Sequence, residues 1–137
     1  MRLLICFLTV ITLASCKSEK QGVKISPKAE LHFGNAGGMA NARNEFIITA
    51  DGKLYQQMNG GPRKLLTDIG EKKAISLMHD GLDLGLDKLD FKHPGNMTNF
   101  LIYNDGTKTN EVDWGDPQNT PSGDIKSFYE KLFELRP

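Results

Sequence analysis

Cysteine is scarce in this chain of 137 residues, and no cysteine follows Cys16. A stretch without thiols can form no disulfide, bind no metal through cysteine and use no cysteine nucleophile. Its length and its apolar fraction of 39% are those of one domain with a modest core. We therefore expect the domain to fold and act without cysteine chemistry.

An excess of charge of one sign is also absent, because 17 lysines and arginines balance 17 aspartates and glutamates. A balanced chain lacks the overall electric field that attracts nucleic acid or other polyanions. This balance argues against a nucleic-acid-binding protein.

Recognisable catalytic and metal-binding patterns are missing as well. The histidines His32, His79 and His93 stand far apart, and none belongs to an H-E-x-x-H or H-x-H pattern. No serine lies in a G-x-S-x-G motif. We predict that the protein is not an enzyme, and we expect no catalytic residue, no cofactor and no metal ligand.

The glycine-rich stretch 33–46, FGNAGGMANARNEF, matches no phosphate-binding motif. Dinucleotide and P-loop motifs place their glycines between a strand and a helix, whose N-terminus binds the phosphate. Here the glycines are followed by Glu45-Phe46-Ile47-Ile48, which is typical of a strand. We expect a flexible connection between Phe33 and Phe46, in which glycine permits positive φ angles.

What the chain does have, at its beginning, is the pattern of a secretory leader. Residues 1–15 contain one basic residue, Arg2, and then an apolar run too short to cross a bilayer. The sequence Leu13-Ala14-Ser15-Cys16 resembles the bacterial lipobox, which implies cleavage before Cys16 and lipid on its thiol. We predict a signal peptide at 1–15 and an exported protein anchored to a bacterial membrane through Cys16.

The residues after Cys16 are polar and show no apolar periodicity, so 16–28 is predicted to be the lipidated cysteine and a flexible tether. Lys17 and Ser18 do not provide the aspartate that retains some lipoproteins at the inner membrane. The outer membrane is therefore favoured over the inner one.

Residues 29–137 are predicted to form a single α+β domain in the order βββαββα, with two helices on one face of a largely antiparallel sheet. The five expected strands cover residues 29–33, 45–50, 53–58, 98–103 and 109–114. Asp51-Gly52 and Asp105-Gly106 are typical of hairpin turns.

Apolar residues at helical spacing predict the two helices. The first is expected over 70–84 with Asp68 as its cap, and the second is expected to begin at Thr120-Pro121. The apolar stripe of the second helix contains Ile125, Phe128, Tyr129, Leu132 and Phe133.

An acidic run and a tryptophan leave alternatives open. Four aspartates at positions 80–90 favour a solvated helix face, but with a histidine they form the alternative of a metal- or small-ligand-binding protein or enzyme. Trp114 either closes the core under the last helix or belongs to a recognition surface, where tryptophan is enriched.

The glycine pair Gly37-Gly38 after the first strand, the segment Trp114-Gly115-Asp116 and the closing proline-initiated helix together resemble the emfourin-like family. The resemblance implies a small α+β domain that inhibits a thermolysin-type metalloprotease, related to the protealysin inhibitor. It does not identify inhibitory contact residues. The sequence therefore predicts a lipid-anchored, non-enzymatic protein-binding module of the cell envelope. Its candidate partner-binding residues are Gly37, Gly38, Met39, Arg43 and Trp114.

Overall fold

The computed structural model describes residues 22–137, so the predicted signal peptide, Cys16 and the first part of the tether lie outside the described residues. The described chain contains seven strands and two helices. The strands are β1 (Glu30–Gly37), β2 (Ala42–Thr49), β3 (Lys53–Met58), β4 (Lys64–Asp68), β5 (Lys92–His93), β6 (Met97–Asn104) and β7 (Thr109–Trp114). The helices are α1 (Glu71–Asp83) and α2 (Gly123–Phe133). No described helix is long and apolar enough to cross a membrane.

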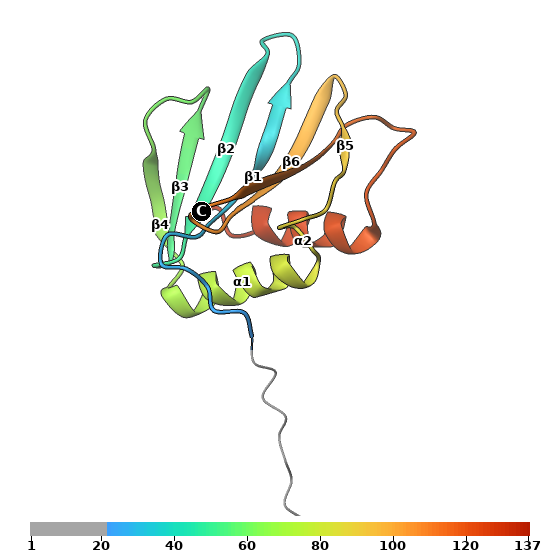
Figure 1. Ribbon diagram of the computed structural model, residues 1–137. Helices are drawn as coiled ribbons and strands as arrows, with labels where there is room; N and C mark the ends of the chain where they lie inside the picture. The colour runs from blue at the N-terminus through green and yellow to red at the C-terminus, as the bar shows by residue number, and fades with distance from the viewer. Residues whose placement is uncertain (1–21) are drawn as a thin grey trace, which may run out of the picture.

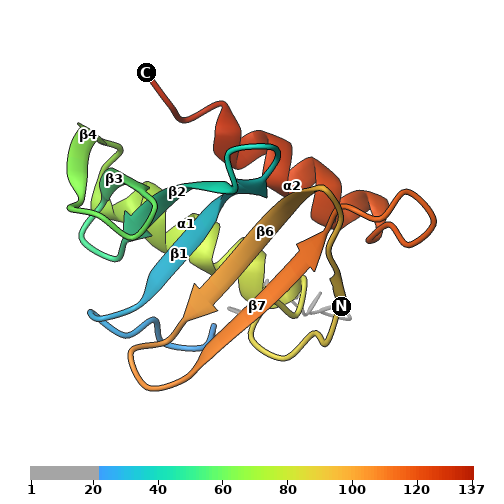
Figure 2. The ribbon, with the colours of Figure 1, turned by 90° about the horizontal axis from the view of Figure 1, so that it is seen from above.

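All the strands form one sheet in the order β4-β3-β2-β1-β6-β7-β5. Every neighbouring pair is antiparallel except β5 with β7, which is parallel. Both helices cover the same face of this sheet (Figures 1 and 2). The α+β class and the two helices are confirmed. The prediction of about five strands is wrong, because β4 and β5 were not expected.

Strand alternation explains where the core lies. Leu31 and Phe33 of β1 point to the helix-bearing face and are fully buried, as are Leu132 of α2 and Met78 of α1. Phe33 stacks on Phe46 of β2, with ring centroids 5.3 Å apart. One continuous apolar cluster therefore joins the sheet to both helices.

The two predicted hairpins are present, with β2 paired to β3 and β6 paired to β7. Gly52 and Gly106 adopt φ angles of +95° and +94°, which glycine reaches without strain. A Cβ on Gly52 would also overlap the backbone of Gly70, so this position accepts no larger residue.

The glycine-rich stretch is not the long connection that we expected. β1 continues to Gly37 and β2 begins at Ala42, so only residues 38–41 form the turn. The strands pair in register from Glu30 with Thr49 to Gly37 with Ala42. Glycine and asparagine are weak strand formers, but here pairing with β2 and β6 on both sides of β1 overrides that propensity.

The helix starts also differ from those predicted. The N-cap of α1 is Gly70, and Asp68 instead accepts a hydrogen bond from the Gly70 N–H at 2.8 Å. The N-cap of α2 is Ser122, whose hydroxyl accepts from the Ile125 N–H, so Thr120 is not the cap. Serine is as good a cap as threonine, and sequence spacing did not separate them.

The segment 22–28, predicted to be tether, lies against the domain. Ile25 packs on the core, and the Ala29 N–H donates to the Ser26 carbonyl at 2.9 Å. The single apolar side chain of Ile25 was too weak a signal to reveal this contact. Residues 25–29 thus contact the domain, and the tether at 16–28 stays a prediction.

Candidate functional site

The turns at one end of the sheet gather three of the exposed apolar side chains of residues 22–137. We call this the distal end: the β1–β2 turn 38–41, the β3–β4 turn 59–63, the loop 94–96 before β6, and the strand ends Gly37, Met58 and Met97 that border them. Figure 1 shows the β1–β2 turn and the β3–β4 turn at the same end of the sheet. Met39, Met58 and Met97 are exposed here, whereas Met78 is buried.

Gly37 and Gly38, two of the predicted site residues, shape the turn that carries Met39. Both have positive φ angles, +113° and +74°. The Gly38 N–H donates to the Asn96 carbonyl at 2.9 Å, which ties the turn to the loop before β6. Met39 is left fully solvent-exposed at the tip, so the structure brings these three predicted residues together.

Arg43, another predicted site residue, lies on the helix-free face instead of at the tip. Its guanidinium group packs 3.8 Å from the centre of the Phe100 ring. Its Nε donates to Glu45 Oε2 at 3.1 Å. The Phe100 ring lies over Gly34, where a Cβ would come within 2.9 Å of it. Arg43 therefore shields an aromatic ring that no helix covers.

Trp114, the remaining candidate within residues 22–137, belongs to the core. Its side chain is only 7% exposed. Its ring meets the Tyr129 ring of α2 edge to face, with centroids 5.0 Å apart. This position leaves little tryptophan surface for a partner.

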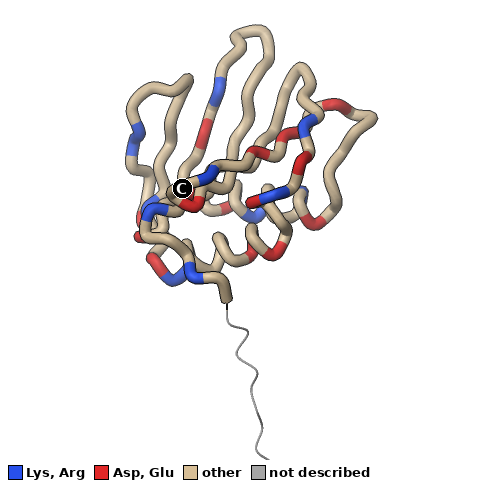
Figure 3. The backbone as a smooth tube through the Cα atoms, viewed as in Figure 1, with Lys and Arg blue, Asp and Glu red and all other residues tan. Residues whose placement is uncertain are grey.

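Basic and acidic residues are both spread over the strands and helices of the described chain (Figure 3). Some of them form a charged network on the helix-free face that the sequence did not reveal. His32 Nδ1 lies 2.6 Å from Glu45 Oε1, and His32 Nε2 lies 2.9 Å from Glu30 Oε2. Arg63 completes it with two hydrogen bonds to Glu30, at 2.7 and 3.1 Å. We name Glu30, His32, Arg43, Glu45 and Arg63 the outer-face network. Ile47, which pairs with His32 in the sheet, is fully buried.

The network lowers the pKa of both glutamates. Hydrogen bonds from His32 and then from Arg43 lower the pKa of Glu45, although partial burial opposes them. For Glu30 burial acts to raise the pKa, but hydrogen bonds from Arg63 and His32 outweigh it and the pKa falls. An ionised carboxylate only accepts hydrogen bonds, so both His32 contacts form together when each ring nitrogen carries a proton.

This network was invisible in the sequence because its members come from β1, β2 and the β3–β4 turn. The only available signal was alternation: His32 stands between the inward residues Leu31 and Phe33, and Glu45 precedes a buried run. Antiparallel registry then brings the two side chains to the same face. Without the pairing, neither residue could be assigned a partner.

The acidic run and the other histidines are not brought together. Asp80 forms an ion pair with Lys131 of α2 at 2.9 Å, and His93 packs on Phe91 instead. Within residues 22–137 no three His, Cys, Asp or Glu side chains are arranged to hold a metal ion. The geometry gives no support to the metal-binding alternative.

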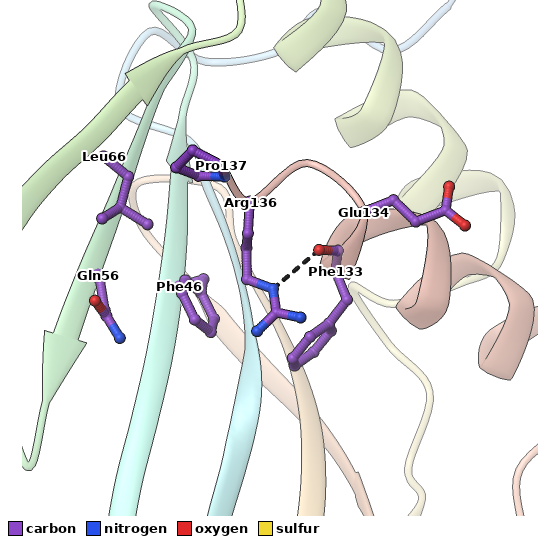
Figure 4. A pocket seen from close by; sticks show the side chains of 7 residues that line it. All are labelled: Phe46, Gln56, Leu66, Phe133, Glu134, Arg136 and Pro137. Carbon is purple, nitrogen blue, oxygen red and sulfur yellow. Dashed lines mark hydrogen bonds between the residues drawn. The ribbon is translucent and has the colours of Figure 1, made fainter.

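A pocket of about 450 Å³ opens on the helix-bearing face, between β2, β3, β4 and the end of α2. Figure 4 shows Phe46 and Phe133 beside the guanidinium group of Arg136, with Gln56 across from them. Arg136 Nε donates to the Phe133 carbonyl at 2.9 Å. The pocket therefore combines aromatic walls with one amide and one cation, and Glu134 also lines it.

Comparison with known proteins adds no relative. No protein-family model matches the chain, and no curated protein matches it. The resemblance to the emfourin-like family therefore rests on the short motifs alone and stays a prediction.

Proposed function

We propose that the protein is a lipid-anchored, non-enzymatic module of the bacterial cell envelope that binds another protein through its distal end. The observation that carries this proposal is the exposure of Met39, Met58 and Met97 at one end of the sheet. Methionine is flexible and polarizable, and it is used at surfaces that adapt to a partner. Exposing apolar side chains to water is unfavourable, and a partner that covers them removes this cost.

The course of the described chain supports a distal end that faces away from the membrane. The described chain begins at the end of the sheet opposite the distal end, where Gly22 lies beside His79 of α1 (Figure 1). The eight residues of β1 then span roughly 25 Å to the distal end. A membrane anchor that precedes residue 22 would thus leave the methionines facing away from the bilayer.

Photo-crosslinking tests the binding surface. A photoreactive amino acid at position 39 is expected to give a discrete crosslinked species in intact cells. The matched control carries it at Lys108, which is exposed in the β6–β7 turn at the opposite end. No product from position 39, or the same products from both positions, would contradict the proposed surface.

Metalloprotease inhibition is the specific form that the family resemblance suggests, and the β1–β2 turn 38–41, which joins two eight-residue strands, is the segment that would enter a cleft. The chain carrying Cys16→Ser, which has no lipid, should lower the activity of a thermolysin-like protease at micromolar concentration. Met39→Asp should relieve that inhibition. Unchanged proteolysis across a panel of such proteases from the same organism would reject inhibition and leave the protein-binding proposal standing.

A further inference from the structure

Three asparagines lie side by side on the helix-bearing face, next to the side of α2 that faces the distal end. Asn35 of β1 pairs in register with Asn44 of β2 on one side and with Asn99 of β6 on the other. Each stands two residues from a core side chain of its strand, so strand alternation puts all three on the core face. All three are half-buried. We call Asn35, Asn44 and Asn99 the amide row.

Towards the distal end, the amide row is bordered on β6 by Met97, which lies two residues before Asn99 and opposite Gly37. The next inward positions on β1 and β2 are Gly37 and Ala42, which are paired with each other and have almost no side chain. On the other side, the Tyr129 hydroxyl lies 3.1 Å from Asn99 Oδ1 and marks where the cover of α2 ends. We call the half-buried surface that the amide row presents between α2 and the distal end the shelf.

The amide row has unused hydrogen-bonding groups. Gln56 Nε2 donates to Asn44 Oδ1 at 3.0 Å, but the amide nitrogens of Asn44 and Asn99 donate to no residue within 22–137. The Asn35 side chain makes no hydrogen bond to any residue in that range. Each amide group carries both donors and an acceptor. Such a row matches a ligand whose own groups both donate and accept, as hydroxyl groups do.

Gln56 connects the row to the pocket of Figure 4, because it also lines that pocket. There the Arg136 guanidinium group lies 4.2 Å from the centre of the Phe133 ring and 5.2 Å from that of Phe46. Glu134 lines the same pocket, but no carboxylate of residues 22–137 forms an ion pair with Arg136, unlike Arg43 and Arg63. One end of the shelf thus presents a cation beside aromatic rings.

We propose that this shelf and pocket form a binding site for an acidic oligosaccharide. The sugar carboxylate would pair with Arg136, its hydroxyl groups with Gln56 and the amide row, and an apolar ring face with Phe133. Asn44 and Asn99 are two strand spacings apart, roughly 10 Å, which suits a ligand of more than one ring. This site does not depend on the proposed partner at the distal end.

An extended peptide fits this site less well. β1 lies between β2 and β6 and is hydrogen-bonded to both. Its backbone therefore offers no free edge for β-strand addition, which is the main way an extended peptide gains affinity on a sheet. A sugar needs only the side-chain groups that the amide row provides.

Side-chain amide NMR signals of ¹⁵N-labelled protein carrying Cys16→Ser provide the test. Trigalacturonic acid at millimolar concentration is expected to shift the signals of Asn35, Asn44, Asn99 and Gln56 along one saturable curve. The signal of Asn104, on the opposite face, should stay in place. Absence of saturable shifts, equal shifts at Asn104, or shifts produced by trialanine and not by the sugar would each overturn the proposal.

Two variants separate the roles of the amide row and the cation. Asn35→Ala should weaken trigalacturonic acid binding about fivefold, the effect of losing one hydrogen-bonding group. Arg136→Gln should abolish the preference for trigalacturonic acid over neutral galactotriose, whereas the exposed Lys108→Gln should retain it. Since Asn35 and Arg136 are not core residues, unchanged thermal unfolding checks the fold. Unaltered affinity and preference in both variants would reject the site.

Discussion

The hydroxyl group of Tyr129 donates a hydrogen bond to the carbonyl oxygen of Gly34 at 2.8 Å, which joins the last helix to the first strand across 95 residues of sequence. The contact is half-buried, and the Tyr129 ring packs on Trp114. Burial raises the pKa of the Tyr129 phenol above its usual range, so the group remains a donor at neutral pH. It fixes α2 on the sheet at the point where the amide row begins.

Tyr129→Phe should reduce the free energy of unfolding by about 1 kcal/mol, because the ring still packs but the carbonyl loses its donor. Urea denaturation at pH 7 measures this change. Tyr55→Phe is the matched control, since the Tyr55 hydroxyl makes no hydrogen bond to residues 22–137. An equal loss in both variants would contradict the role given to Tyr129.

Stability should fall in acid because of the outer-face network. The pKa of Glu45 in the folded protein lies below its ordinary value of 4.5. The unfolded chain therefore binds the proton more readily, so the stabilisation is complete above about pH 4.5 and is lost as the pH falls through the folded pKa. The pKa of Glu30 is lowered too, so Glu30 adds to the loss of stability in acid. Unfolding free energies from pH 7 down to pH 3 measure the slope.

Two matched variants identify which carboxyl group makes the free energy of unfolding depend on pH in acid. Glu45→Gln should flatten the acid dependence, because the variant has no carboxyl group to face His32 and Arg43. Glu130→Gln should not flatten it, since Glu130 is exposed on α2 and makes no side-chain hydrogen bond to residues 22–137. A slope that is the same in wild type and Glu45→Gln would show that other groups cause it.

Two glycine substitutions should change the free energy of unfolding in opposite directions. A Cβ at Gly34 would overlap the Asn44 carbonyl and come within 2.9 Å of the Phe100 ring, so Gly34→Ala should cost about 2 kcal/mol or more. Gly123 is the first residue of α2 and has open space around it. Gly123→Ala should stabilise the protein by about 0.5 kcal/mol. Thermal unfolding measures both, and the same sign for both would contradict this account.

Substitutions at Met39 and Trp114 should distinguish a residue exposed for binding from a residue needed for folding. Met39→Ala should change the free energy of unfolding by less than about 0.5 kcal/mol, because the side chain is fully exposed. Trp114→Ala should cost about 3 to 5 kcal/mol, since it empties a core position. Trp114→Phe, a milder change, provides a second measurement if the alanine variant does not fold. Strong destabilisation by Met39→Ala would mean that the turn is structural.

Lipid attachment at Cys16 should be visible as incorporation of labelled palmitate into the protein in cells. Cys16→Ser should abolish the label and release the protein from membranes, because the thiol is the predicted site of acylation. Cys6→Ser, inside the predicted signal peptide, is the control and should leave the label. Label that persists in Cys16→Ser would refute the predicted anchor.

Local sequence patterns determined much of the fold. Apolar periodicity placed both helices, and the two Asp-Gly pairs placed two hairpins, because these features depend on neighbours in the chain. The same reasoning predicted that the first strand ends at Phe33, since Gly34, Asn35 and Gly37 are poor strand formers. It also missed β5, whose two residues are a strand only through pairing with β7.

The candidate sites depended on the tertiary structure much more. The sequence alone placed Gly37, Gly38 and Met39 in a glycine-rich connection from Phe33 to Phe46, because glycine permits positive φ angles, but it did not show that only residues 38–41 form the turn. The outer-face network, the amide row and the position of Trp114 under Tyr129 join residues that are distant in sequence. Such juxtapositions follow from strand order and register, which cooperative burial of the core selects and no local pattern encodes.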